Sequence, residues 1–272
     1  VVCRRQRQMC IRDRYQDDDI FKINNETSNV WLKNQIEKLK KIPNLTIKNR
    51  TSVAAFHGYN YLLARENLTD HLGAHERKGK IRQRLLKIRA KKVVIATGAI
   101  ERPLIFNNND RPGIILSSSI KKYIDYYGVK TGENISLFTN NDSAYETAIS
   151  LNKSGVKVKV IIDIRENPSS ILSEKIEKAG IKILRGHTIT NTDGYKRIKS
   201  IDVMKLSKDG ENVVGNKTTY KCDCLGISGG WTPMVHLFTQ SGGKLKFRNN
   251  DNVFIPDENK TPSEQILSLI HI

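Results

Sequence analysis

The stretch from Lys91 to Pro103 constrains the fold most, because a short apolar run in it is stopped at once by Thr97-Gly98. Three of the four apolar residues in 93–96 are β-branched, and the run is too short for a helix, so it predicts a buried parallel strand that ends in a tight turn. Ligands of open α/β sheets bind at the carboxyl ends of strands, and a glycine there lets backbone approach a ligand closely. The stretch predicts either such a site or a core strand with an ordinary turn.

The size of the chain, 272 residues of which 38% are hydrophobic, allows one large or two ordinary domains. No apolar run reaches the roughly 18 residues of a membrane span, and no signal-peptide pattern is present, so we expect a soluble cytoplasmic protein. The cysteines lack the spacing of a zinc or redox pair, so we expect reduced packing residues and no metal site. They are Cys3, Cys10, Cys222 and Cys224.

The net charge of +18 raises the possibility of nucleic-acid binding, because clustered lysines and arginines release counterions from phosphates. The lysines are spread over the whole length instead of being clustered, and no helix-turn-helix, zinc finger or sheet-borne aromatic pair is recognisable. We therefore expect neither nucleic acid nor membrane as a partner.

Both ends of the chain carry sequence that resembles translated sequencing-library ends, namely 9–14 and 267–272. Such scars are excluded before fold reasoning. We expect residues 1–14 and 267–272 to be non-native, which leaves an internal piece of a longer protein. The alternative is a genuine basic N-terminal arm.

The region 15–127 shows the periodicities of a mixed α/β domain. A helix capped by Ser28 and ended by Pro43, with Leu32, Ile36 and Leu39 on its apolar side, is expected to cover one face of a sheet. A short strand, 45–47, and antiparallel strands in 51–65 and 84–89 follow, around a polar loop, 69–79, whose His71 and His75 we do not assign to a metal. A second helix begins at 117–119; its buried stripe is predicted to be Ile120, Tyr123, Ile124 and Tyr127, with Gly128 as left-handed cap.

The region 128–220 contains a βαβ pattern. Strand 134–138 leads through a turn into a helix with Ala144, Ala148 and Leu151 on one face, and strand 156–162 ends at Asp163, where a Rossmann fingerprint places its ribose-binding acid. The three glycine positions of that fingerprint are Thr139, Asn141 and Ala144. We interpret this unit as one that keeps the architecture and has lost the ligand.

Further along, a helix capped by Ser169 or Ser170 and strands in 181–184, 188–190 and 198–206 predict a second meander. The segment 220–228 is another strand stopped by glycines, Gly229 and Gly230, and we interpret it as a return to the first domain. We expect the strand ends near Gly98 and Gly229 to lie side by side and to border one nucleotide site. The segment 236–244 either faces that site or is a surface loop.

The sequence thus predicts an α/β fold of two Rossmann-like dinucleotide-binding domains, the second inserted in an incomplete first, with small antiparallel β-meanders. The boundaries are 15–127 for the remainder of the first FAD/NAD(P)-binding domain, 128–220 for the inserted domain, and 221–266 for the return.

Several motifs resemble those of known flavoproteins. Ala96-Thr97-Gly98-Ala99 with Glu101-Arg102-Pro103 resembles the second dinucleotide motif of the two-dinucleotide-binding-domain, glutathione reductase-like flavoproteins. More specifically, a set of four segments is similar to the alpha subunits of heterotetrameric sarcosine oxidases: 109–113, 138–145, 228–238 and 240–244.

This resemblance implies an enzyme complex that oxidatively demethylates sarcosine to glycine. Electrons pass through FAD and FMN to oxygen, and the one-carbon unit passes to tetrahydrofolate. It further implies NAD on the alpha subunit, FMN between alpha and beta, FAD and substrate on beta, and beta, gamma and delta subunits as partners. The N-terminal G-x-G-x-x-G unit and the C-terminal tetrahydrofolate domain of that family are absent from this sequence.

Nothing in the sequence has the context of a catalytic acid, base or nucleophile, so no catalytic residue is assigned. The resemblance implies dinucleotide contacts at Thr97, Gly98, Ala99, Glu101, Arg102, Pro103, Gly229, Gly230 and Trp231. Arg102 either pairs with a phosphate or fixes the turn. Two alternatives stay open: a subunit of another amine, opine or proline dehydrogenase, and a non-catalytic docking module.

Overall fold

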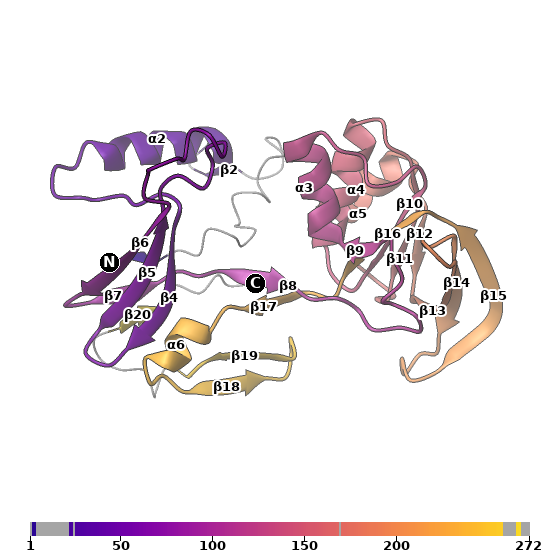
Figure 1. Cartoon of the computed structure of the whole chain (residues 1–272). Coiled ribbons are helices and arrows are strands. Elements are labelled where there is room, and N and C mark those ends of the chain that lie inside the picture. Colours follow the sequence, from indigo (N-terminus) through magenta and orange to yellow (C-terminus); the bar gives the residue numbers. More distant parts are fainter. Residues whose placement is uncertain (1, 4–21, 24, 169, 258–264, 268–272) are drawn as a thin grey trace. The chain divides into compact units, whose positions relative to one another are not determined.

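The computed structural model describes residues 2–3, 22–23, 25–168, 170–257 and 265–267. The chain divides into two compact units, one formed by residues up to Ile100 and from Thr232 on, the other by Glu101–Trp231 (Figure 1). Both chain crossings between the units fall in two short strands that pair with each other, β8 (Ala99–Glu101) and β17 (Trp231–Pro233).

The first unit contains the strand predicted from the Val-Val-Ile run, β7 (Val93–Ile95). It pairs in parallel with β1 (Val2–Cys3) and with β20 (Gln265–Leu267), and its Val93 and Ile95 are fully buried. The prediction of a buried parallel strand is confirmed. Apart from the three residues in β1 and β20, the stretches 1–14 and 267–272 expected to be non-native lie outside the described residues.

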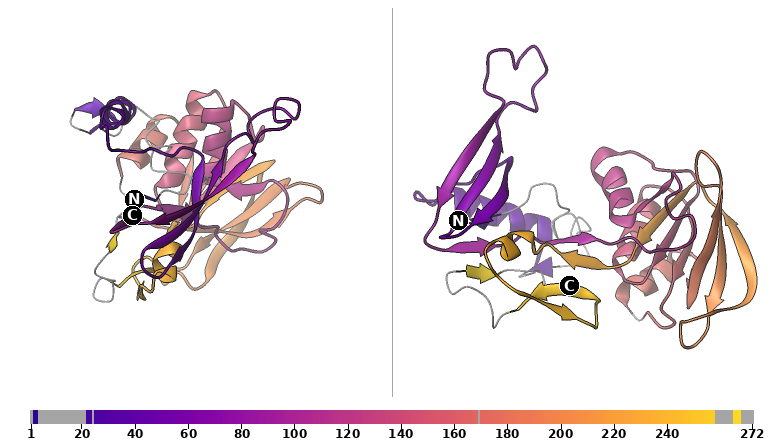
Figure 2. Two further views of the ribbon diagram at one scale, coloured as in Figure 1. Left: turned by 60° about the vertical axis from the view of Figure 1, so that its left-hand side comes forward. Right: turned by 60° about the horizontal axis from the view of Figure 1, so that its bottom comes forward.

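A three-stranded antiparallel meander lies in the same unit, as the alternating pattern predicted. Its strands are β4 (Thr51–His57), β5 (Tyr61–Asn67) and β6 (Gln83–Arg89), in that order across the sheet. Figure 2 shows the polar loop between β5 and β6 extending beyond the strands. One face of the meander joins β7 in a core of Phe56, Leu62, Val93, Ile95, Leu237 and Phe238.

The remaining elements of this unit are short, apart from one helix. They are α2 (Ser28–Lys40), β2 (Lys22–Ile23), β3 (Glu26–Thr27), α6 (His236–Gln240), β18 (Leu245–Arg248) and β19 (Val253–Pro256). The helix α2 begins one residue earlier than predicted, since its N-cap is Thr27 and not Ser28. It packs mainly against the short strands β2 and β3 and leaves Leu39 exposed, so the prediction that its apolar side covers a sheet face is wrong. The predicted strand at 45–47 is also wrong, because Leu45 and Ile47 are exposed and have no neighbouring strand to pair with.

The second unit is built on a five-stranded parallel sheet, which confirms the predicted Rossmann-like βαβ architecture. The strands in spatial order are β12 (Ile183–Arg185), β11 (Val158–Asp163), β10 (Ile135–Thr139), β16 (Cys224–Ser228) and β9 (Ile114–Leu116). Every residue of β10 and β16 is buried, as expected for central strands covered on both faces.

Helices cover one face of this sheet and a second meander covers the other (Figure 1). The helices are α3 (Ser117–Tyr127), α4 (Ser143–Lys153) and α5 (Ile171–Lys178), the last capped by Ser170 as predicted. The meander consists of β13 (His187–Asp193), β14 (Ser200–Leu206) and β15 (Val213–Lys221), the last of which the sequence analysis missed.

The helix α3 confirms two predictions and contradicts a third. It begins at Ser117 and ends at Gly128 in the left-handed conformation. The predicted buried stripe is confirmed at Ile120, which is fully buried, but it is wrong at Tyr123 and Tyr127, which are exposed. The buried face instead carries small and polar groups that bond to α4: Ser117 Oγ donates to Thr147 Oγ1 at 3.0 Å, and Lys121 Nζ donates to Ser150 Oγ at 2.8 Å.

The second unit is wider than the predicted insert, 128–220, because β9, α3 and β16 belong to it. The strand that was expected to return the chain to the first domain, β16, pairs instead with β10. The strands β7 and β16 lie in different sheets, which contradicts the expectation that the strand ends near Gly98 and Gly229 lie side by side around one nucleotide site.

None of the helices in the described ranges is long and apolar enough to span a bilayer.

Candidate functional site

The strand order of the second unit contains a switch point. From β10 the chain moves outward through β11 to β12, whereas β16 and β9 lie on the other side of β10. In open α/β sheets ligands bind at the carboxyl ends of the strands where the order reverses. Here that place lies between β10 and β16, where Thr139 is paired in register with Ser228.

This switch point is bridged by the side chain of Asn141. Its Nδ2 donates to the carbonyl oxygen of Ser228 at 3.1 Å and to the Ser228 hydroxyl at 3.0 Å. Its Oδ1 accepts the backbone N–H of Ser143 at 3.0 Å and also the Ser143 hydroxyl. Trp231 Nε1 donates to the same Ser143 hydroxyl at 3.2 Å. The asparagine therefore ties the two strand ends and the start of α4 together.

The acid in the ribose position, Asp163, is fully buried and bound by its own chain. Its carboxylate accepts from the Tyr145 hydroxyl at 2.6 Å, from the backbone N–H of Arg165 at 2.8 Å, and from the Arg165 guanidinium at 2.8 and 3.1 Å. Arg165 also donates to Asp142 at 2.7 Å. Burial and the bond to Asp163 raise the pKa of Tyr145, so its hydroxyl stays protonated and remains a donor.

The residues at this switch point do not fit a dinucleotide. A ribose-binding acid needs a free carboxylate oxygen, and those of Asp163 are taken by Tyr145 and Arg165. A pyrophosphate needs bare backbone at the second glycine position, where Asn141 places a side chain that bridges the strands. The sequence had identified the positions Thr139, Asn141 and Asp163. It missed Tyr145, Arg165 and Ser228, whose partners become visible only once the strand ends meet.

Six of the nine residues predicted to contact a dinucleotide lie in the second unit, where several of them form hydrogen bonds or close contacts with other residues of that unit. Gly229 N–H donates to the Arg102 carbonyl at 2.7 Å, and Arg102 N–H donates to the Gly230 carbonyl at 2.8 Å. A Cβ on Gly229 would lie 2.7 Å from the carbonyl oxygen of Pro103, so the chain itself requires glycine there. Glu101 Oε2 accepts the backbone N–H of Ser118 at 2.9 Å, and Trp231 bonds to Ser143 as described above.

The other three predicted residues lie in the first unit, at the end of β7. Thr97 Oγ1 donates to the carbonyl of Met234 at 2.7 Å, and Met234 N–H donates to the carbonyl of Gly98 at 2.9 Å. Gly98 has a φ of 74°, in the left-handed region that favours glycine, and Ala99 is buried. The chain runs from β7 through residues 96–98 directly into β8 without a hydrogen-bonded turn, so the prediction of a tight turn is wrong. Contact of any of the nine residues with a dinucleotide stays a prediction.

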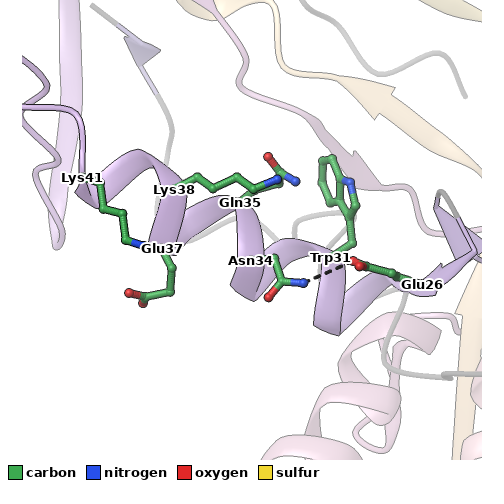
Figure 3. A pocket seen from close by; sticks show the side chains of 7 residues that line it. All are labelled: Glu26, Trp31, Asn34, Gln35, Glu37, Lys38 and Lys41. Carbon is green, nitrogen blue, oxygen red and sulfur yellow. Dashed lines mark hydrogen bonds between the residues drawn. The ribbon is translucent and has the colours of Figure 1, made fainter.

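A pocket of about 330 Å³ lies along α2 in the first unit (Figure 3). Its lining mixes acidic and basic side chains with Trp31, and Asn34 Nδ2 donates to Glu26 at 3.3 Å across it. None of the residues predicted to contact a cofactor lines it. The full lining is Glu26, Trp31, Asn34, Gln35, Glu37, Lys38 and Lys41.

The two cysteines of the second unit, Cys222 and Cys224, are buried and not bonded to each other, which confirms their prediction as reduced packing residues. Burial raises the pKa of the Cys222 thiol to about 12. In the described part of the chain, no three His, Cys, Asp or Glu side chains gather in a way that would hold a metal ion.

Comparison with known proteins places the fold in a family. Residues 18–267 match the model of the pyridine nucleotide-disulphide oxidoreductases. The sarcosine oxidase subunit alpha of Corynebacterium sp. (strain U-96) is 36% identical over 226 residues, which are 83% of this chain and 23% of that protein. The sarcosine oxidase subunit alpha of Rhizobium meliloti (strain 1021) is 32% identical over 208 residues, 76% of this chain and 20% of that protein. The chain thus spans about a quarter of the length of the curated relatives it matches or less.

Solved structures agree on the fold. The L-proline dehydrogenase from P. horikoshii superposes with a TM-score of 0.65 at 21% identity, covering 98% of this chain and 45% of that one. A bacillithiol disulfide reductase from Staphylococcus aureus superposes with a TM-score of 0.58 at 15% identity, covering 94% and 73%. The resemblance to sarcosine oxidase alpha subunits seen in the sequence is confirmed by the curated relatives and the family match. The chain belongs to the pyridine nucleotide-disulphide oxidoreductase family.

Proposed function

We propose that this chain is part of the alpha subunit of a heterotetrameric sarcosine oxidase. The observation that carries the proposal is the agreement of two curated relatives, both named sarcosine oxidase subunit alpha, over more than three quarters of the chain. In the proposed complex, sarcosine is oxidatively demethylated to glycine, with electron transfer through FAD and FMN and one-carbon capture by tetrahydrofolate. The beta, gamma and delta subunits and the cytoplasmic location expected from the sequence belong to this proposal.

Within the chain, we assign the NAD contacts to Thr97, Gly98 and Ala99, which follow β7, in preference to the six residues predicted in the second unit. Gly98 there has a positive φ of 74°, a backbone conformation that favours glycine. At the switch point of the second unit, by contrast, the groups that would hold a dinucleotide are already bonded within the unit. FMN between the alpha and beta subunits, and FAD on the beta subunit, follow from the resemblance alone.

The proposal is tested by restoring the complete alpha subunit and co-expressing it with the beta, gamma and delta subunits. We expect oxygen uptake that depends on sarcosine, and none from the present chain by itself. A complex that takes up oxygen with L-proline but not with sarcosine would instead support the alternative of a proline or other amine dehydrogenase subunit, a class that includes a solved structure with a TM-score of 0.65.

The NAD assignment has its own test in the restored subunit. Gly98→Val should weaken NAD binding, measured by titration calorimetry, because the side chain stands at the strand end. Gly128→Val is the matched control, since Gly128 also has a positive φ of 61° and has open space around its Cβ position. Unchanged NAD affinity in Gly98→Val would remove the assignment. No heat from the unmodified subunit would favour a pure docking module.

A further inference from the structure

We propose that the outer face of the β4–β5–β6 meander binds an acidic segment of a partner protein. This face, called the basic sheet face below, consists of Tyr61, Leu63, Arg65, Leu85, Lys87 and Arg89. The proposal concerns the first unit alone and does not depend on the oxidase function.

The register of the strands places these six side chains together. Tyr61 is opposite Arg89, Leu63 opposite Lys87, and Arg65 opposite Leu85. Opposed residues of an antiparallel pair share a face, and alternate residues of one strand share it too. The intervening residues Leu62 and Ala64 are fully buried on the other face, so the basic sheet face points away from the core.

The face combines exposed cations with apolar surface. Arg65, Lys87 and Arg89 are all exposed, Leu85 is 61% exposed, and Tyr61 and Leu63 are half-buried between them. The Arg89 guanidinium carbon lies 5.9 Å from the centroid of the Tyr61 ring. The ring centroid of His57, on the neighbouring strand β4, lies 6.0 Å from the ring centroid of Tyr61. Tyrosine and arginine next to aliphatic groups are the residues that carry most binding energy in protein interfaces.

Among the residues that the structure describes, none supplies an acid to this face. Within the described residues, Arg65, Lys87 and Arg89 form no ion pair. The acid within these three strands, Glu66, alternates to the opposite face, where Lys48 bonds to it at 3.0 Å and Arg84 lies 3.6 Å away. In the adjoining loop, Asp70 is paired with Arg50, and Glu76 accepts from the backbone of Gly73.

The second meander shows that such cations can be balanced within the chain. There Asp202 on β14 accepts from Lys217 at 3.1 Å and from Thr219 at 2.7 Å on β15. On the basic sheet face no described residue provides such a carboxylate, and its charges complement an acidic surface of a partner protein.

The apolar part of the face favours protein over nucleic acid. Nucleic acids bind antiparallel sheets by stacking bases on exposed aromatic rings. On this face Tyr61 and His57, which is opposite it on β4, have ring centroids 6.0 Å apart and tilted planes, and Arg89 already lies over the Tyr61 ring. Leu63 and Leu85 offer aliphatic contacts, which suit an acidic segment that carries apolar residues at alternate positions.

The probe for this proposal is a fluorescein-labelled twelve-residue peptide in which glutamate alternates with leucine or tyrosine. Binding is followed by fluorescence anisotropy at low and at physiological salt. Two further probes are the same peptide with glutamine in place of glutamate and a single-stranded dT12 oligonucleotide. The variants are the triple change Arg65→Gln, Lys87→Gln and Arg89→Gln, and the matched triple change Lys205→Gln, Lys217→Gln and Lys221→Gln on the second meander.

We expect the acidic peptide to bind the unmodified chain at least tenfold more tightly than its glutamine form. The first triple variant should lose about tenfold in affinity and the matched triple variant less than twofold. Leu85→Ala should lose about threefold with an unchanged salt dependence. The proposal is overturned if the peptide does not bind, if both triple variants lose equal affinity, or if dT12 binds more tightly than the peptide and with the same dependence on the three cations.

Discussion

The carboxylate of Asp163, in the unit from Glu101 to Trp231, has donors from Tyr145 and Arg165 of the same unit. In the other unit, the cations Arg65, Lys87 and Arg89 have no carboxylate among the described residues. A buried polar group without a hydrogen-bond partner costs free energy of folding, whereas an exposed charge is solvated by water and needs no partner within the chain. The second unit therefore uses its polar groups for its own stability, and the first unit leaves part of its charge for binding.

The largest expected effect comes from breaking the pairing of Asp163. Asp163→Asn should lower the free energy of unfolding by about 3 kcal/mol, because it removes the fully buried carboxylate of the ion pair with Arg165 and leaves that guanidinium with Asp142 alone. Urea unfolding followed by circular dichroism measures this change. Glu177→Gln is the control, since its pair with Arg185 is largely exposed and should contribute less than about 1 kcal/mol. Equal losses would show that the pair of Asp163 and Arg165 stabilises the unit no more than an exposed ion pair does.

The next effect concerns close backbone packing in the second unit. Gly229→Ala should cost about 2 kcal/mol, because the new Cβ would meet the Pro103 carbonyl oxygen at 2.7 Å and backbone would have to move. Gly58→Ala is the matched control in the first unit, where nothing lies within 4 Å of the added Cβ, and its unfolding midpoint should shift little. A harmless Gly229→Ala would reopen the view that this glycine makes room for a ligand.

A smaller effect is expected at the bridge across the switch point. Asn141→Ala removes the bonds to Ser228 and Ser143 and should cost about 1 to 2 kcal/mol in urea unfolding. Ser207→Ala, which removes a hydroxyl bonded in an exposed turn, should cost less. If Asn141→Ala instead left the free energy of unfolding unchanged and increased the NAD affinity measured by calorimetry, the role of Asn141 would be to exclude NAD and not to stabilise the fold.

The smallest expected effect lies on the basic sheet face. The triple change of Arg65, Lys87 and Arg89 to glutamine should leave the free energy of unfolding within about 0.5 kcal/mol, because exposed cations without a counter-charge contribute little. Lys217→Gln, which removes a cation paired with Asp202, serves as the reference. A loss of more than about 1 kcal/mol in the triple variant would mean that these cations are paired within the chain, and the contrast between the two units would fail.

Much of the fold could be predicted from local sequence patterns. The Val-Val-Ile run, the βαβ unit around Ala144, Ala148 and Leu151, and the caps at Ser170 and Gly128 follow from rules that act over a few residues, and all were predicted. Sheet membership was not predictable in this way. Nothing within the segment 224–228 tells whether its strand pairs with β7 or with β10, because both choices bury the same side chains.

The helix α3 shows a second reason for failure. Its tyrosines have helical spacing and look like a core stripe. The neighbouring helix α4, however, places Thr147 and Ser150 where they form hydrogen bonds with Ser117 and Lys121, so these residues of α3 are buried and the tyrosines are exposed. Residues at the switch point posed the same difficulty. Position alone identified Asp163, but the identity of its partners depends on where Tyr145 and Arg165 come to lie.

The hydrogen bond between Arg102 N–H and the Gly230 carbonyl joins residues that are next to the two ends of the second unit. A module whose entry and exit are neighbours can be spliced into a host chain, deleted from it, or rejoined head to tail at little geometric cost. Genetic exchange of this unit between relatives would then require only that the short β8–β17 ladder be preserved at the junction.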